Sequence, residues 1–369
     1  MMRARVACAL VVVAVVVAGC GSHRTLAPAT VAPQPKVLHL ALISARTGAL
    51  LPGSPDIFLN AAVSDGLGGW FVGGGSVGLA HLLADGQLDP TWGSPLSRQV
   101  SVSLLVRSGS RLYVEDSGRV EAFDTTGTRL WVGPRVSGRV LHQVGGRVFA
   151  LAASSTRVYL GGDFTRVGGA LRRSLAALDA RTGRLLDWRM PLLRNGDGPD
   201  ATNAYVGALA FAASRLYVGG VFSAIGGHPR SGLAALDPRT GAVLSWRVAN
   251  AGGDLETIFV IYGGVITAGF DSFGAFDAHT GRRLPWMSRL GGSATTFAAD
   301  GPLLYLGGGL RSGFGSVAGR PRHNLAAINL ATGRFTAWGP NLAPFVTVGT
   351  IVPSGKDVLV LGSFTNSIG

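Results

Sequence analysis

The chain has very little cysteine, lysine or glutamate. Its 369 residues include two cysteines, Cys8 and Cys20, two lysines, Lys36 and Lys356, and three glutamates. Arginine therefore carries nearly all of a formal net charge of +13. The arginines are scattered through turn sequences and are not clustered with aromatic residues, so the charge does not indicate nucleic-acid binding. The seven histidines show no zinc-ligand spacing and the chain contains no P-loop, which argues against both kinds of site.

The chain also lacks long stretches with the apolar spacing of an amphipathic helix. Short runs rich in Val, Leu, Phe and Tyr alternate instead with turn residues, in a chain with 56 glycines and 18 prolines. This pattern is typical of an all-β protein. At 369 residues, the chain is long enough to bury a large core.

The N-terminus carries an export signal. Arg3 and Arg5 precede an apolar run over residues 6–19, which is shorter than the roughly 20 residues needed to cross a membrane. The run ends in Val-Ala-Gly-Cys20, which resembles the lipobox of bacterial lipoproteins. The resemblance implies cleavage before Cys20 and attachment of a lipid to its sulfur. The alternative is an ordinary signal peptide with an incidental cysteine.

We therefore expect a lipoprotein signal peptide at residues 1–19 and a flexible Pro/Ala/Thr tether at residues 20–35. The protein would be exported, anchored to the cell membrane by lipidated Cys20, and would face outside the cytoplasm. Because Cys8 leaves with the signal peptide, the folded domain would contain no disulfide and no cysteine nucleophile.

Internal repeats organise the rest of the chain. One half-unit is an apolar strand ending in glycines, as in LYVGGVF at 216–222, and the other is a strand, an Asp-type turn, a glycine and usually a tryptophan, as in LAALDPRTGAVLSW at 233–246. Each half occurs seven times, and a further apolar strand precedes each glycine-ending strand. The unit thus predicts four strands with a period typical of propeller blades. The turn glycines are Gly48, Gly86, Gly127, Gly183, Gly241, Gly281 and Gly333.

The first and last units are complementary halves. The chain begins with a turn half and ends with a glycine-strand half, VLVLGSF at 358–364. We therefore predict a seven-bladed β-propeller over residues 36–369, in which residues 36–52 and 345–369 form one blade. The N-terminal strands would complete the last blade and close the ring, leaving no exposed edge.

The repeat resembles two known patterns. LYVGGVFSAIGGHPRSGLAALDPRTG is similar to the delta-60 repeat of bacterial β-propellers, and AALDARTGRLLDW resembles the repeat of pyrroloquinoline quinone (PQQ) enzymes. A non-catalytic PQQ-repeat lipoprotein of the outer-membrane assembly machinery shares the lipid anchor and the propeller. PQQ chemistry would require Ca²⁺ held by Glu, Asn and Asp. With so few glutamates we expect no PQQ and predict no other cofactor.

Three groups of residues are candidates for a ligand site. Long loops would place arginines on one rim, and carboxylates of neighbouring blades would gather on the same face. Asn195, Asp197 and Asp200 have the oxygen-rich spacing that Ca²⁺ accepts. Simple solvation of loop charge is the alternative to the arginine rim, and ion pairing with arginine is the alternative to a metal. The arginines are Arg172, Arg173, Arg230, Arg320 and Arg322, and the carboxylates are Glu115, Asp116, Asp163, Asp254 and Glu256.

Because no catalytic constellation is present, we expect a membrane-tethered, monomeric, non-catalytic propeller that binds a protein or glycan partner. The alternative is an exported quinoprotein-like oxidoreductase or another propeller enzyme. A buried group of convergent polar residues would favour the enzyme, whereas a flat or wet face would favour the binding protein.

Overall fold

The chain divides into two compact units, Met1–Gln34 and Pro35–Gly369. The structure, a computed structural model, describes residues of the second unit only. The signal peptide, Cys20, Asp197, Asp200, Asp254 and Arg322 lie outside the described residues. The described residues are 37–52, 57–75, 77–96, 100, 102–140, 143–144, 146–188, 191–195, 204–249, 255–261, 264–269, 272–284, 294–308, 316–317, 320–321, 324–340 and 347–365.

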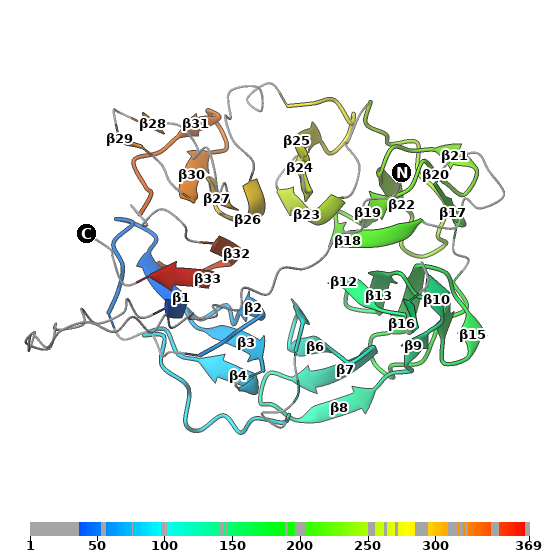
Figure 1. Cartoon of the computed structure of the whole chain (residues 1–369), viewed down its shortest axis with the longest axis horizontal. Coiled ribbons are helices and arrows are strands. Elements are labelled where there is room, and N and C mark those ends of the chain that lie inside the picture. The colour runs from blue at the N-terminus through cyan, green and yellow to red at the C-terminus, as the bar shows by residue number, and fades with distance from the viewer. Residues whose placement is uncertain are drawn as a thin grey trace, which may run out of the picture. The chain divides into compact units, whose positions relative to one another are not determined.

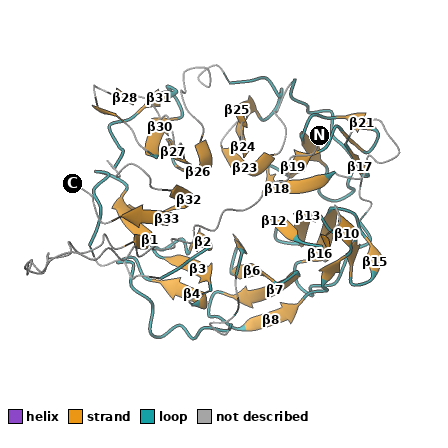
Figure 2. Ribbon diagram, viewed as in Figure 1, coloured by secondary structure: helices purple, strands orange, loops and turns teal. Residues whose placement is uncertain are grey.

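Strands and turns, with no helix, make up the described residues, which confirms the prediction of an all-β fold. Seven sheets carry the repeats (Figures 1 and 2), and we number them 1–7. Sheet 1 contains β2 (Ala61–Ser64), β3 (Trp70–Gly74) and β4 (Gly78–Leu82); sheet 2 contains β5 (Leu104–Ser108), β6 (Arg111–Asp116), β7 (Arg119–Asp124) and β8 (Arg129–Val132); sheet 3 contains β12 (Val148–Ala153), β13 (Arg157–Gly162) and β16 (Leu175–Asp179); sheet 4 contains β18 (Tyr205–Ala212), β19 (Arg215–Val221) and β22 (Leu233–Leu236); sheet 5 contains β23 (Leu255–Ile261), β24 (Gly264–Gly269) and β25 (Ser272–Asp277); sheet 6 contains β26 (Ala294–Asp300), β27 (Leu303–Gly308), β30 (Leu325–Asn329) and β31 (Arg334–Phe335); and sheet 7 contains β32 (Thr347–Ser354), β33 (Asp357–Thr365) and β1 (Val37–Ser44).

Short strands of two residues lie in the connections between the repeat strands. Two of these small sheets lie in the links between the second and third strands of sheets 3 and 4, where β14 pairs with β15 and β20 pairs with β21. The short strands are β9 (Val136–Ser137), β10 (Arg139–Val140), β11 (Gln143–Val144), β14 (Arg166–Val167), β15 (Ala170–Leu171), β17 (Leu193–Arg194), β20 (Ala224–Ile225), β21 (His228–Pro229), β28 (Ser316–Val317) and β29 (Arg320–Pro321).

The first strand of each sheet contacts the first strand of the next sheet. These contacts run from β2 to β5, β12, β18, β23, β26 and β32, and β32 in turn contacts β2. Figure 1 shows β18, β23, β26 and β32 as the innermost strands of their sheets. The sheets therefore succeed one another in chain order, and their first strands line a common centre.

Sheet 7 joins distant parts of the sequence. β1 pairs antiparallel with β33, from Val37 opposite Thr365 to Ser44 opposite Asp357. Leu40, Leu42 and Ile43 of β1 are almost fully buried. The early strand is therefore an integral part of the late sheet, as the complementary half-units predicted.

Within the described residues, most units have three full strands and not the four that were predicted. Among the described residues, only sheets 2 and 6 of the seven have a fourth strand. In five other units the segment makes one isolated bridge, at Leu50, Leu88, Leu185, Val243 and Arg283. In three of these units the tryptophan that follows the bridge, Trp92, Trp188 or Trp246, packs against the next sheet.

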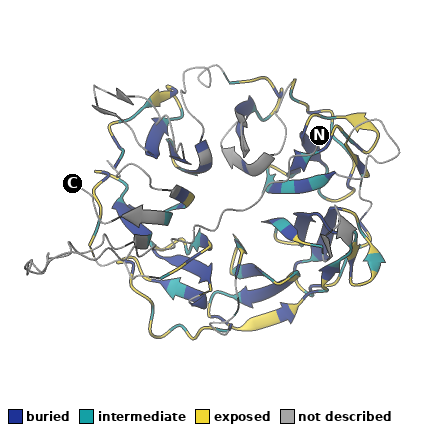
Figure 3. Ribbon diagram, in the orientation of Figure 1, coloured by how far each residue is buried: buried dark blue, intermediate teal, exposed yellow. Residues whose placement is uncertain are grey.

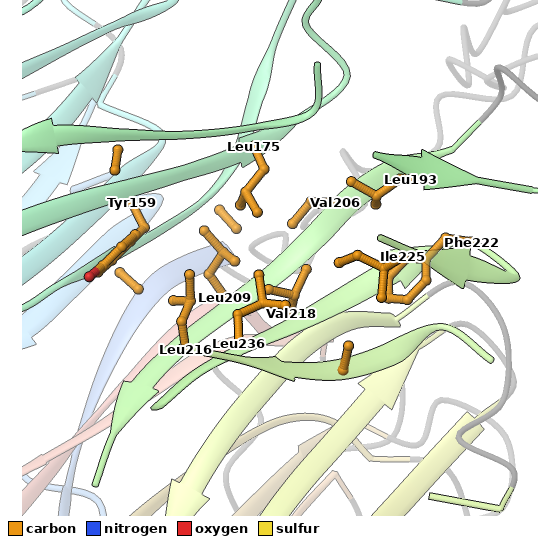
Figure 4. Close-up of a cluster of buried hydrophobic side chains, with 14 of the residues drawn as sticks. Tyr159, Leu175, Leu193, Val206, Leu209, Leu216, Val218, Phe222, Ile225 and Leu236 are labelled. Atoms are coloured by element: carbon orange, nitrogen blue, oxygen red, sulfur yellow. The ribbon is translucent and has the colours of Figure 1, made fainter. Parts of the chain in front are cut away.

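Tryptophan and apolar strand residues form the core between sheets. The second and third strands of the sheets are mostly buried, whereas many residues of the outer loops are exposed (Figure 3). Figure 4 shows the cluster where Tyr159 and Leu175 of sheet 3 meet Leu209 and Leu216 of sheet 4. Four indole N–H groups donate to carbonyls in the turn of the next sheet. The pairs are Trp92 to Thr125 (2.9 Å), Trp131 to Ala180 (3.1 Å), Trp246 to Asp277 (3.1 Å) and Trp338 to Ser44 (2.9 Å).

The turn residues have the local roles that the repeat predicts. All seven turn glycines have positive φ angles, between 63° and 91°. In the turn of sheet 3, the Asp179 carboxylate accepts hydrogen bonds from the N–H groups of Arg181 (3.0 Å) and Thr182 (2.8 Å). These carboxylates are therefore occupied by the scaffold.

Candidate functional site: an arginine pocket between sheets 4 and 5

Those predicted carboxylates whose side chains the structure describes serve the scaffold. Glu115 is buried and accepts hydrogen bonds from the Ser103 hydroxyl and from the Gly118 N–H (2.7 Å). Asp163 is also buried, and it accepts a hydrogen bond from the Arg147 N–H (2.7 Å). Both carboxylates stabilise their own backbone, so neither is aimed at a ligand.

The other predicted acidic residues contribute less. The Asp116 carboxylate accepts a hydrogen bond from the neighbouring Ser117 hydroxyl (2.8 Å). Glu256 lies in β23, and Asp254 falls outside the described residues. Among the residues that the structure describes, no group of three or more His, Cys, Asp or Glu could hold a metal ion. Asn195 is exposed, whereas Asp197 and Asp200 lie outside the described residues, so Ca²⁺ binding there stays a prediction.

Two of the predicted rim arginines fold back onto the sheets. Arg172 donates to the Leu186 carbonyl (3.3 Å), and Arg230 donates to the Leu244 carbonyl (2.9 Å). Because each bond spans 14 residues, these arginines occupy equivalent positions in sheets 3 and 4. Arg173 is exposed. Arg320 lies in β29, and Arg322 lies outside the described residues.

Arg230 also lines a pocket of about 680 Å³ between sheets 4 and 5. The pocket brings together four arginines, and no carboxylate is among the lining residues that the structure describes. Phe276 and Val248 add apolar surface. The lining residues are Ser223, Pro229, Arg230, Ser231, Arg247, Val248, Ala249, Phe276, Thr280, Gly281, Arg282 and Arg283.

The link between the second and third strands is shorter in sheet 5 than in sheet 4. In sheet 4 a long link with β20 and β21 connects the second and third strands, and a Cβ on its Gly226 would lie 3.0 Å from the side chain of Val243. In sheet 5 the corresponding strands are joined by a tight connection, with Gly269 opposite Ser272. Arg283 makes the bridge that Val243 makes in sheet 4. A position that the loop covers in one sheet therefore faces a pocket in the next.

In sheet 3, the arginine equivalent to Arg230 has a carboxylate nearby. Arg172 lies 3.4 Å from the carboxylate of Asp187, the residue directly after Leu186. The residue that follows Leu244 in sheet 4 is Ser245. In the part of the chain that the structure describes, no carboxylate pairs with Arg230. The carboxylate of the sheet 3 arrangement is thus replaced by a hydroxyl.

Burial and a neighbouring positive charge act together on Arg230. Burial, with a smaller effect from Arg247, lowers the pKa of the Arg230 guanidinium, which stays charged at neutral pH. Its Nε is buried and makes no hydrogen bond within the described structure, as is also true of Arg172. Like charges held together at a partly buried site favour binding of an anion. The described lining residues are arginines, hydroxyl residues and apolar residues, an arrangement that suits binding of an anion.

The central pocket does not fit PQQ. It has a volume of about 160 Å³, and within the described residues its lining consists of glycine, alanine, leucine, valine, isoleucine and phenylalanine from β5, β12, β18 and β23. The carboxylates of a quinone cofactor require basic or polar partners, which this surface does not supply.

Arg247, Arg282 and Arg283 were not predicted from the sequence. The repeat gave only a weak signal, because the residue two positions after the turn glycine is apolar in five units but is an arginine in two, Arg129 and Arg283. The spatial approach of Arg247 and Arg230 could not be read from the sequence, because it depends on how sheets 4 and 5 pack.

No helix in the described part of the chain is long and apolar enough to cross a membrane. A search of curated proteins finds no match. Among solved structures, the computationally designed protein Ika8 covers 89% of this chain and 90% of its own at 14% identity, with a TM-score of 0.55. The extracellular domain of BT4673 from B. thetaiotaomicron covers 88% of this chain at 12% identity and a TM-score of 0.54, and the match spans 42% of that chain. These likenesses concern the fold.

A third solved structure, BamB from Moraxella catarrhalis, is 18% identical over 88% of this chain and 91% of its own, with a TM-score of 0.48. The model of a PQQ-like repeat family, described as outer membrane protein assembly factor BamB, matches residues 43–200 and again residues 91–339. Such overlapping matches are expected of a chain built from similar repeats. They confirm the prediction of PQQ-like β-propeller repeats, and the chain belongs to the PQQ-like repeat family of outer membrane protein assembly factor BamB.

Proposed function

We propose that this protein is an exported, membrane-tethered β-propeller that acts as a non-catalytic scaffold for a partner protein. The observation that carries the proposal is the use of the repeated polar residues. Asp179 and its equivalents bind their own turns, while Glu115, Asp163 and Arg172 bind backbone or a neighbouring side chain. A partner would therefore bind the outer surface of the protein. The description of the family names an assembly factor, which supports a role in binding other proteins.

We also infer that the seven sheets are the seven blades of a ring that β1 closes. Two observations support this inference. The contacts between first strands return from β32 to β2, and the Trp338 indole of sheet 6 donates to the Ser44 carbonyl at the end of β1. A ring of this kind presents rigid loops on two faces, as an interaction scaffold requires.

Exposed apolar side chains on the connecting loops are the best places to test for a partner. Leu171 in β15 is 56% exposed and Leu192, just before β17, is 51% exposed. A photo-reactive amino acid at either position, introduced into the full chain in its own host, should give a discrete covalent adduct with one protein. The same amino acid at Ser110 or Ser155, in tight turns between strands, should give none.

Adducts at none of these four positions would contradict the scaffold proposal, as would a diffuse smear at all four. Adduct formation should not depend on added substrate or redox cofactor. A requirement for either would favour the alternative, an exported enzyme.

A further inference from the structure

We propose that a second pocket, between sheets 3 and 4, binds a saccharide that carries a carboxylate, such as a uronic acid. This pocket, which we call the turn pocket, has a volume of about 420 Å³. A saccharide site goes beyond the scaffold function, because it needs no protein partner. The lining residues are Ser154, Ser155, Thr156, Arg157, Tyr159, Asp179, Leu186, Phe211, Pro238 and Arg239.

Turns of the two sheets form the walls of the turn pocket. Residues 154–156 connect β12 to β13, and Pro238 and Arg239 belong to the turn that follows β22. The Arg157 guanidinium donates to the carbonyls of Pro238 and Arg239, each at 3.0 Å, and the Tyr159 hydroxyl donates to the Pro238 carbonyl (3.0 Å). These bonds fix the sheet 4 turn against sheet 3, so the walls are in place before a ligand binds.

An aromatic side chain in this pocket is a first departure from the repeat. Phe211 lies opposite Leu216, beside the turn between β18 and β19. Its ring stacks on that of Tyr159, with 6.2 Å between the centroids and 20° between the planes. Tyr159 is almost inaccessible, so the half-buried Phe211 supplies the accessible aromatic surface. The corresponding residues of the other sheets are not aromatic, namely Ser64, Arg107, Ala153, Val260, Ala299 and Pro353.

An unpaired tryptophan is a second departure from the repeat. Four of its counterparts donate the indole N–H to a carbonyl in the turn of the next sheet, as Trp131 does to Ala180 (3.1 Å). In the part of the chain that the structure describes, the Trp188 Nε1 is buried without a hydrogen-bond partner, although its ring lies 5.5 Å from that of Tyr159. A buried donor left unpaired costs stability. The scaffold is therefore less complete beside the turn pocket than at the equivalent places, which indicates a role other than packing.

The mixture of groups in the pocket favours a charged sugar over a purely apolar or a purely anionic ligand. The C–H face of a sugar ring is apolar and can stack on Phe211, while its hydroxyl groups can bond to Ser155 and Thr156. All hydrogen bonds that the Asp179 carboxylate accepts within the described residues go to Oδ1, so Oδ2 can accept one from a sugar hydroxyl.

Charge and size complete the match. The described lining residues include two arginines and one aspartate, so they carry an excess of positive charge. Arg239 is exposed, and its planar guanidinium can bind a carboxylate through two parallel hydrogen bonds. The volume of about 420 Å³ lies within the range of small-molecule sites.

The direct test is calorimetric binding of a tetrasaccharide of alternating glucuronic acid and N-acetylglucosamine to the full-length protein in detergent. Its control is the same tetrasaccharide with each carboxyl group reduced to an alcohol. We expect saturable binding of the acidic saccharide, weakening as salt is raised because Arg239 is exposed. The reduced saccharide should bind at least about tenfold more weakly, since it loses a charge-assisted contact.

Arginine variants at equivalent turn positions locate the carboxylate. Arg239→Gln should weaken binding of the acidic saccharide at least about tenfold and leave binding of the reduced saccharide unchanged. The matched control is Arg46→Gln, which removes the same charge from the same position in the turn of sheet 7. Arg46 is also exposed, and its loss should change affinity less than about twofold.

A ring variant locates the sugar. Phe211→Leu keeps an apolar side chain but removes the aromatic face, so it should weaken binding of both saccharides by about threefold or more. In saturation-transfer NMR, irradiation of the aromatic protons of the protein should saturate the ring C–H protons of the sugar most strongly. The variant should reduce this transfer.

A turn variant keeps the proposal testable if Phe211→Leu fails to fold. Thr156→Asp adds a carboxylate to the lining and should weaken binding of the acidic saccharide by about fivefold or more. Ser110→Asp is the control, because the Ser110 carbonyl accepts a hydrogen bond from the Thr125 N–H as the Thr156 carbonyl does from the Ala180 N–H. Both residues are exposed, and the control should change affinity less than about twofold.

Several results would overturn the proposal. They are equal binding of the acidic and reduced saccharides, no binding of either, unchanged affinity in the Arg239 and Thr156 variants, or displacement of the saccharide by acetate at equimolar concentration. Tighter binding of an octapeptide of alternating glutamate and leucine than of the saccharide would assign the pocket to a protein instead. If saccharide binding fails while the Leu171 adduct persists, the scaffold function stands and only this site is wrong.

Discussion

At the scale of single residues, the turn of each repeat combines a local and a distant requirement. Gly183 has a φ of 70°, which disfavours other residues, and a Cβ at this position would lie 2.5 Å from the Trp131 ring of the preceding sheet. Asp179 lies at the same turn, and hydrogen bonds from Thr182 lower the pKa of its carboxyl despite a smaller opposing effect of desolvation. The residues of one turn thus determine its backbone conformation and also contact the tryptophan of the preceding sheet.

Replacing Gly183 separates these two requirements. Gly183→Ala should reduce the free energy of unfolding by about 2–4 kcal/mol, from the strained φ and the collision with Trp131. Gly169→Ala is the control, because Gly169 has a φ of 84° and no atom within 4 Å of its Cβ position. It should lose only about 1–2 kcal/mol. Urea denaturation measures both, and equal losses would contradict the role of the Trp131 contact.

His81 lies between two carboxylates in sheet 1, a contact that the sequence did not reveal. Its Nδ1 is 2.9 Å from Asp89 and its Nε2 is 3.1 Å from Asp65. Hydrogen bonds from Thr91 and His81 lower the pKa of Asp89 to about 2. Desolvation raises the pKa of Asp65, but hydrogen bonds from the Leu67 N–H, His81 and the Gly69 N–H, together with the charge of His81, outweigh it and lower that pKa overall.

These lowered pKa values predict a loss of stability in acid. Each carboxylate contributes stability that is present above its unfolded pKa of about 4 and is lost as pH falls through its folded pKa. For Asp89 the window runs from about pH 4 to about pH 2. Asp89→Asn, which cannot titrate, should flatten the dependence of unfolding free energy on pH in this window. An unchanged slope, relative to wild type and to the exposed-turn variant Asp85→Asn, would refute this.

At the scale of elements, sheet 7 depends on a strand from the other end of the sequence. Leu40, Leu42 and Ile43 are nearly inaccessible, and removing β1 would expose the edge of β33. Loss of three such side chains costs about 2–5 kcal/mol each, comparable to the whole stability of a typical domain, about 5–15 kcal/mol.

Truncation tests this dependence. Deletion of residues 21–50 should abolish cooperative unfolding or lower the melting temperature strongly, because β1 is removed. Deletion of residues 21–33 should leave it unchanged. Circular dichroism on heating distinguishes the two, and a wild-type melting temperature for the longer deletion would contradict the contribution of β1.

The strand pattern could largely be predicted from the sequence, because each repeat encodes its own local structure. Alternating apolar residues and turn glycines mark β3 and β19, and the complementary half-units predicted the pairing of β1 with β33. The fourth strand was predicted in more units than have one, because its residues have strand propensity. In the structure, Trp246 and its equivalents contact the next sheet, and the chain follows them away from its own sheet.

The candidate site could be predicted only in part. Arg230 was recognised from its loop, but its surroundings depend on side chains from two sheets, and local sequence carries no information about how those sheets pack. Glu115 and Asp163 were wrongly expected to face a ligand. Their polarity was visible in the sequence, whereas the backbone groups that they bind were not.

At the scale of the whole molecule, location would be decided by one residue of the N-terminal segment. If the proposed signal is cleaved and Cys20 is the anchor, Cys20→Ala should abolish lipid labelling and shift the protein from the membrane fraction to the soluble fraction. Ultracentrifugation after labelling with a radioactive fatty acid measures both effects. Continued pelleting of the variant in high salt would argue for a different anchor.

The pairing of β1 with β33 also has a consequence in time. A ribosome releases the chain from its N-terminus, so Ser44 is made about 310 residues before its partner Asp357. At typical rates of synthesis this interval is roughly 15–60 s. Throughout it, the apolar side chains of Leu40, Leu42 and Ile43 have no native strand beside them. Until its last strand is made, such a chain must be protected from association through these side chains. We therefore expect a chaperone to bind the residues of β1.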